Sequence, residues 1–213
     1  MEYLKGMTKT YLPPQPGAFY HIFNRGNNGE PIFFREENYG YFLQKLAGYL
    51  TPYLDVYAYC LLRNHFHFLV KTKRQDEIDA TLLRVQTGNK ILSDFSQVIS
   101  EAFRRFFLCY AKSIKIQEGR TGSLFEKNFK RIEVTNSDHL YWLVNYIHRN
   151  PETHGVVADF KSYPYSSYAS ILCDIPTKLK RQEVLDMFGG REEFVRFHLT
   201  NPVNNSDDYL KIE

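Results

Sequence analysis

The sequence is poor in cysteine and in long apolar runs, and each shortage excludes a class of protein. The only cysteines, Cys60, Cys109 and Cys173, are far apart and odd in number, so they form neither a disulfide framework nor a cysteine-based zinc site. No apolar stretch approaches the roughly 20 residues that span a bilayer, and the start of the chain shows no signal-peptide pattern. We therefore expect a cytoplasmic protein with no membrane partner.

Net charge is also small, at +3 over 213 residues. Bulk charge therefore does not indicate a nucleic-acid partner, and local charge has to be considered instead. Aromatic residues, in contrast, make up 16% of the chain. Abundant Tyr and Phe suit sheets and apolar cores, and they also suit surfaces on which bases stack.

Hydrophobic periodicity predicts an α+β chain with the order β-α-β-β-α-β-α. The expected strands are 19–25, 54–62, 65–71 and 129–134, and the expected helices are 36–50, 90–114 and 137–150. Residues 72–90 are expected to form a loop, and Pro151 to stop the last helix. The first six elements match the ferredoxin-like arrangement, an antiparallel sheet with helices on one face and with its first and third strands at the centre.

One expected strand carries two histidines. His65 and His67 share a face with Leu69, because side chains alternate with a period of two along a strand. Two imidazoles held side by side can offer two nitrogen ligands to one metal ion. The alternative is a pair of half-exposed histidines that bind nothing, and the motif alone does not separate the two readings.

The helix expected over 137–150 places a tyrosine beside an amide. Tyr146 and Asn150 lie one turn apart on one flank of the helix. Its core face is formed by apolar residues at helical spacing, namely Leu140, Leu143, Val144 and Ile147. The phenol is then either a boundary residue that only packs, or a group at the rim of a site with an amide oxygen one turn away.

These motifs together resemble a known family. His65-Phe66-His67 is similar to the His-hydrophobe-His motif of single-tyrosine HUH nucleases. The segment Tyr146-Ile147-His148-Arg149-Asn150-Pro151 resembles the tyrosine helix of IS200/IS605-type transposases, in particular the branch of REP-associated tyrosine transposases. Tyr20-His21-Ile22 and Asn24-Arg25-Gly26 add to the resemblance. The similarity covers about residues 18–172, and the ordered set is far more specific than a lone His-x-His.

The resemblance implies metal-dependent cleavage and rejoining of single-stranded DNA, as in DNA transposition, beside hairpin-forming palindromic repeats. Tyr146 is implied as the nucleophile that forms a 5′-phosphotyrosine intermediate, which conserves the bond energy for rejoining. His65 and His67 are implied as ligands of Mg²⁺ or Mn²⁺, with Asn150 as a third ligand. The divalent ion would neutralise and orient the phosphodiester.

Local charge indicates where DNA would lie. Between residues 101 and 131, basic residues outnumber acidic residues by five. The expected DNA contacts come from this region and from the first loop: Arg25, Asn27, Arg104, Arg105, Lys127, Lys130 and Arg131. For the charges on the long helix, a solvated helix face is the alternative.

The resemblance divides the chain into three parts. They are an extended lead-in (1–17), an HUH tyrosine transposase domain (18–172) and a small helical C-terminal extension (173–213). The sequence leaves open a monomer or a homodimer that exchanges tyrosine helices. It also leaves a second class of function, a ferredoxin-like nucleic-acid-binding module that stacks bases on its aromatic side chains and does no chemistry.

Overall fold

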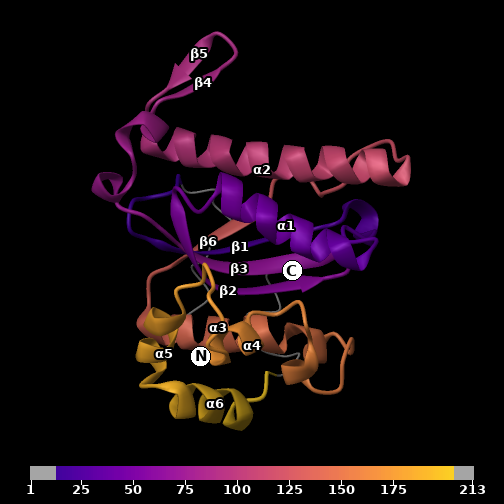
Figure 1. Cartoon of the computed structure of the whole chain (residues 1–213), viewed down its shortest axis with the longest axis vertical. Helices are drawn as coiled ribbons and strands as arrows, with labels where there is room; N and C mark the ends of the chain where they lie inside the picture. Colours follow the sequence, from indigo (N-terminus) through magenta and orange to yellow (C-terminus); the bar gives the residue numbers. More distant parts are fainter. Residues whose placement is uncertain (1–12, 204–213) are drawn as a thin grey trace.

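A computed structural model describes residues 13–203, in which helical layers enclose one antiparallel sheet (Figure 1). The sheet order is β2-β3-β1-β6, and every neighbouring pair is antiparallel. The strands are β1 (Phe19–Arg25), β2 (Leu54–Leu62), β3 (His65–Thr72) and β6 (Lys130–Val134). The α+β class and the antiparallel sheet are confirmed. Most of the predicted lead-in and the end of the predicted extension lie outside the described residues.

One face of the sheet is covered by two helices, α1 (Glu36–Tyr49) and α2 (Phe95–Glu118) (Figure 1). Phe66, Phe68 and Val70 of β3 point to this face and are buried in its core. Phe42 of α1 packs on Phe66 with their ring centroids 5.3 Å apart. The alternation along β3 therefore places its purely apolar side under α1 and α2, which leaves the histidine side for the opposite face.

The opposite face carries α3 (Ser137–Thr153) and three shorter helices (Figure 1). These are α4 (Tyr168–Leu172), α5 (Arg181–Phe188) and α6 (Arg191–Thr200). Leu69 of β3 packs here with Leu143 and Ile147 of α3 in a second apolar core. The helices α5 and α6, on either side of Gly189 and Gly190, lie in the segment predicted as a small helical extension.

A β-hairpin forms where the sequence predicted the end of the loop 72–90 and the start of the helix 90–114. Its strands are β4 (Val85–Thr87) and β5 (Lys90–Leu92), and it projects beyond α2 (Figure 1). Gly88 in the turn has φ 56°, a left-handed conformation that glycine adopts without strain. The prediction of a helix over 90–94 is wrong, because the apolar pair Ile91-Leu92 belongs to a strand.

The start and end of α2 are set by its caps. The Asp94 side chain accepts a hydrogen bond from the backbone N–H of Gln97 and so caps the N-terminus. The helix runs past Ile114, its predicted end, to Glu118, and the next residue, Gly119, has φ 60°. Left-handed glycine is the usual residue that follows a helix.

Helix α3 continues through Pro151 to Thr153, so the predicted stop at Asn150 is wrong. Proline has no backbone N–H, so Pro151 removes one hydrogen bond from α3 without ending the helix. The backbone N–H of His154 still donates to the Asn150 carbonyl at 3.0 Å. The extra turn places His154 four residues beyond Asn150, on the same flank of the helix. At the other end of α3, the Asn136 side chain caps the helix by accepting a hydrogen bond from the Asp138 backbone N–H.

Two buried histidines join α3 to α6. His148 Nδ1 lies 2.8 Å from His198 Nε2, and His148 Nε2 lies 2.8 Å from Ser167 Oγ. His198 Nδ1 lies 2.7 Å from the Phe194 carbonyl oxygen, which can only accept. The chain of hydrogen bonds therefore runs in one direction, from Ser167 through both rings to Phe194, and it holds both imidazoles neutral.

This pair predicts that the fold is sensitive to acid. Burial lowers the pKa of His148 well below its ordinary value and lowers the pKa of His198 to about 4. The unfolded chain takes up these protons below a pH of about 6.5, whereas the folded chain does not. The contribution of these two histidines to the free energy of unfolding should be fully present above pH ~6.5. It should be lost as the pH falls from ~6.5 to ~4, and the loss for His198 alone is about 3 kcal/mol.

Urea denaturation at a series of pH values measures this loss. In the His198→Gln variant the fall over the same window is expected to flatten, whereas His139→Gln, on the same helix α3 as His148, should keep the wild-type profile. A wild-type free energy of unfolding that stays constant from pH ~7 to ~4.5 would contradict the assignment.

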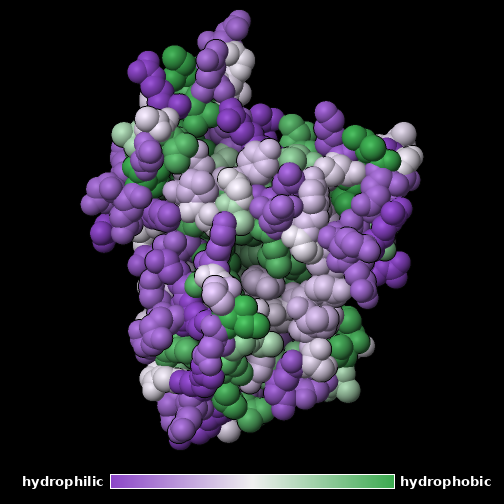
Figure 2. All heavy atoms as spheres, in the orientation of Figure 1, coloured by the Kyte–Doolittle hydropathy of each residue, from purple (hydrophilic) through white to green (hydrophobic). Residues whose placement is uncertain are grey.

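No helix among residues 13–203 is long and apolar enough to cross a bilayer. Polar side chains cover most of the face shown in Figure 2, and apolar side chains gather there in smaller groups. The most exposed large apolar side chains, Ile116 of α2 and Ile175 between α4 and α5, belong to different layers of the molecule.

Candidate metal and nucleic-acid site

A cavity of about 380 Å³ opens where β1 ends and β3 begins, beside the C-terminal turn of α3. Its wall includes both motif histidines, His65 and His67, together with four charged side chains, Arg25, Arg63, Lys130 and Glu126. Arg25 Nε lies 3.3 Å from Glu126 Oε1, which offsets one of the three positive charges. The remaining excess of positive charge suits an anionic ligand such as a phosphate.

His65 connects β3 to α3. Its Nε2 lies 3.1 Å from Asn150 Oδ1, and its Nδ1 lies 2.8 Å from Asn64 Oδ1. Asn150 is fully buried. The structure thus places the amide of α3 against the first histidine within one chain, one of the two arrangements that the sequence leaves open, while the roles of the two residues stay predictions.

His67 lies deeper than His65. Its Nδ1 is 3.0 Å from His21 Nε2, and its ring centroid is 5.5 Å from that of Tyr146, with the planes at 82°. The two motif imidazoles lie 5.3 Å apart, centroid to centroid. Tyr146 is only 1% exposed, so its phenol ring is packed behind the imidazoles rather than standing at the rim of the site.

The site also contains residues that sequence reasoning did not assign to it. His21 reaches His67 from β1, and Asn64 reaches His65 from the β2–β3 turn. His154 packs on His65 with their ring centroids 4.8 Å apart. Two signals were available: the alternation of β1 beside β3, and the continued four-residue spacing from Tyr146 through Asn150 to His154.

Some of the predicted DNA contacts lie at or near the cavity. Arg25 and Lys130 line it, and Lys130 Nζ lies 5.3 Å from the ring centroid of Phe23. Lys127 is exposed just before β6, and Asn27 is half-buried in the short 3-10 turn (Asn27–Gly29) that follows β1. Arg25 and Lys130 therefore form a cationic border beside the histidines, whereas Lys127 and Asn27 lie close to those two basic residues only in the sequence.

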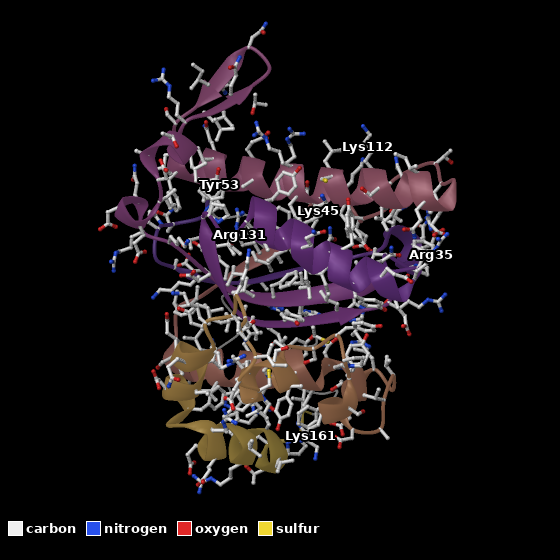
Figure 3. All side chains as sticks on the ribbon, in the orientation of Figure 1. Arg35, Lys45, Tyr53, Lys112, Arg131 and Lys161 are labelled. Carbon is white, nitrogen blue, oxygen red and sulfur yellow. The ribbon has the colours of Figure 1, made fainter. Side chains whose placement is uncertain are left out.

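The other predicted contacts are not brought to the cavity. Arg104 Nε and Arg105 Nε lie 2.6 and 2.8 Å from the carboxylate of Glu101 on α2. The hydrogen bonds from these two arginines hold the pKa of Glu101 at about 2. Arg131 pairs with Ile22 of β1 and therefore points to the α1–α2 face, where Figure 3 labels it. Burial lowers the pKa of its guanidinium.

The donor set for a metal is two imidazoles and one amide oxygen. In the described part of the chain, no three His, Cys, Asp or Glu side chains are placed to hold a metal together. Both ring nitrogens of His65 face amide oxygens, yet a neutral imidazole donates from only one of them. The other nitrogen then directs a lone pair at an oxygen, and a cation between the two atoms would satisfy both.

The amide of Asn150 can adapt to such an ion. Its Nδ2 has no hydrogen-bond partner among the described residues, although it is buried. Without the ion, a half-turn of the amide would let Nδ2 donate to His65 Nε2 instead. The residues therefore fit a divalent ion that takes nitrogen and oxygen ligands, and imidazole favours Mn²⁺ somewhat over Mg²⁺.

Comparisons with known proteins add a likeness in structure. No protein-family model and no curated protein matches the sequence. Among solved structures, the chain is similar to a REP-associated tyrosine transposase bound to a REP hairpin, with a TM-score of 0.52 and 16% identity. The match covers 76% of this chain and 83% of that one. The chain therefore has the fold of a REP-associated tyrosine transposase over about three quarters of its length.

Proposed function

We propose that the protein is a metal-dependent transposase that cleaves and rejoins single-stranded DNA beside hairpin-forming palindromic repeats. The observation that carries the proposal is that Tyr146 and Asn150 contact His67 and His65 within one chain, and that both histidines line a cationic cavity. The fold it shares with a transposase that binds a REP hairpin supports the same function. We also interpret the sheet as ferredoxin-like, because β1 and β3 are its central strands.

In the proposed reaction, the Tyr146 phenol oxygen attacks the scissile phosphorus. The bond from phosphorus to the 3′-oxygen breaks, a 5′-phosphotyrosine forms, and the phenolic proton is balanced by the proton taken up on the 3′-hydroxyl. Attack by another 3′-hydroxyl reverses the step and rejoins the strand, so no outside energy source is required. Arg25 and Lys130 would hold the flanking phosphates.

His65, His67 and Asn150 would hold the divalent ion. When bound, the ion would neutralise charge on the phosphodiester and orient it.

Burial of Tyr146 sets a condition on this chemistry. A phosphodiester reaches the phenol only after α3 opens locally against β3. The same burial favours a second candidate function, a nucleic-acid-binding module that does no chemistry. The two are separated by mixing the protein with Mn²⁺ and single strands that carry hairpins. Release of a fragment with a free 3′-hydroxyl supports the transposase, and retention of intact strands supports the binding module.

We infer that the tyrosine acts in cis, in a monomer. His65 of β3 contacts Asn150 of the same chain, and α3 packs on its own sheet through Leu143 and Ile147. No exchange of helices is then required to complete the site. We also propose a cytoplasmic location, with which the three free cysteines agree.

Replacing Lys130 by Gln is expected to weaken single-strand binding on the order of fivefold, about 1 kcal/mol, whatever the sequence. The slope of log affinity against log salt should fall by about 0.7, because one phosphate contact is lost. Fluorescence anisotropy with metal removed measures both. The matched control is Lys112→Gln on the outer side of α2, remote from the cavity (Figure 3). Equal weakening in both variants would show that the cavity is not the DNA surface.

A further inference from the structure

We propose that Asn64 and His21 are positioning residues that fix the tautomers of the two motif histidines. Each would accept a hydrogen bond from Nδ1–H of one histidine, so that both Nε2 lone pairs are left for one ion. The inference rests on the proposed metal-dependent function and deepens it. It assigns a role to two residues that the reaction itself does not use.

Asn64 has its oxygen aimed at His65 by two other hydrogen bonds. Its side-chain Nδ2 donates to the Gly29 carbonyl at 3.3 Å, and its own carbonyl accepts from the Gly26 backbone N–H at 2.7 Å. The Oδ1 atom is therefore the group presented to His65 Nδ1 at 2.8 Å. An amide oxygen only accepts, and both ring nitrogens of His65 face one. The Asn64 amide is held in place by Gly29, whereas the Asn150 amide can turn its Nδ2 to His65 Nε2, so the proton of neutral His65 belongs on Nδ1.

His21 does the same for His67 from the neighbouring strand. The two rings are stacked with centroids 5.2 Å apart, and a second stack on Phe23 at 4.6 Å holds His21 in place. Between His21 Nε2 and His67 Nδ1, 3.0 Å apart, only one proton fits. If His67 donates, its Nε2 keeps a lone pair for the ion. If His21 donates, neutral His67 carries its proton on Nε2 and cannot bind a metal there.

Asn64 and His21 are different residue types on different elements, yet each contacts Nδ1 of its histidine. Histidine ligands of metals commonly donate their other ring N–H to such an outer partner, which sets the tautomer and the ring orientation. Loss of an outer partner of this kind typically weakens metal binding by about 10- to 100-fold. The expected effect of each residue is therefore on ion affinity rather than on DNA binding.

The tautomers can be read directly by ¹⁵N NMR of the imidazole rings in the metal-free full-length protein. Signals of His65 and His67 are assigned by their absence in His65→Gln and His67→Gln variants. The inference predicts a proton on Nδ1 and a bare Nε2 in both rings. A proton on Nε2 of either ring would overturn it. Because this measurement needs neither DNA nor metal, its failure is distinct from failure of the proposed cleavage reaction.

A set of variants tests the consequence for the ion. By electron paramagnetic resonance, His21→Phe and Asn64→Leu are expected to raise the Mn²⁺ dissociation constant by about 10- to 100-fold. His21→Gln and Asn64→Asp keep an acceptor and should stay within about threefold of wild type, as should the control His139→Gln. Folded His21→Phe protein that binds Mn²⁺ as tightly as wild type would contradict the inference.

Discussion

The Tyr146→Phe variant is expected to form no covalent DNA adduct, a loss on the order of 10³-fold or more. The substitution removes only the nucleophilic oxygen. The Tyr146 ring is buried against His67, and phenylalanine fills the same space, so the variant should fold and keep the DNA affinity of wild type. A strand labelled at its 3′ end reports the adduct, because the fragment downstream of the cut stays on the protein.

The matched control is Tyr141→Phe, on the same helix. Tyr141 packs on Phe188 of α5 with ring centroids 5.3 Å apart, away from the histidines. This variant should form the adduct at the wild-type rate. If Tyr146→Phe forms the adduct as well as wild type, another group is the nucleophile.

Replacing His67 by Leu is expected to weaken Mn²⁺ binding by more than about 100-fold. Removal of a residue that only hydrogen-bonds to a metal ligand costs at most about that much. The variant removes a proposed ligand rather than a residue that positions one, and the apolar leucine side chain suits the buried position. Cleavage should fall with ion binding, whereas single-strand binding in the presence of a chelator should not change, because Arg25 and Lys130 are untouched.

Titration of free Mn²⁺ by electron paramagnetic resonance measures the affinity, and His139→Leu on the same protein is the control. An unaltered Mn²⁺ affinity in the His67→Leu variant would remove the histidine pair from the metal site. The transposase assignment would then have to stand on Tyr146 alone.

The core of the site could be predicted because it depends on local periodicity. A period of two put His65 and His67 on one face of β3, and a period of 3.6 put Tyr146 and Asn150 on one flank of α3. Partners from other elements could not be predicted in the same way. The contact of His21 with His67 depends on the register between β1 and β3, which no single segment encodes.

Local rules also competed with one another. The turn at Gly88 and the cap at Asp94 determine where α2 begins, although the apolar spacing would extend the helix to Lys90. The rule that a proline stops a helix fails at Pro151, and the continuation of α3 beyond it brings His154 to His65. The apolar pattern thus misplaced the start of α2, and the proline rule misplaced the end of α3.

The number of basic residues in a segment predicts DNA contacts less well than the pairing of these residues with nearby carboxylates. Arg104 and Arg105 lie three and four residues after Glu101, a spacing that favours ion pairs on a helix, and both arginines bind this carboxylate. Alternation along β6 separates Lys130, which lines the cavity, from Arg131, which points to the opposite face. Both distinctions were accessible from the sequence.

The most direct test of the account is to identify the residue that carries DNA after cleavage. The wild-type protein is incubated with a hairpin-bearing single strand and Mn²⁺, and the adduct is digested with nuclease and trypsin. Tyr146 lies in the tryptic peptide 132–149 together with Tyr141, and fragmentation by mass spectrometry separates the two. The account predicts a nucleotide joined through its 5′-phosphate to Tyr146. A nucleotide on any other residue, or cleavage with no adduct, would contradict it.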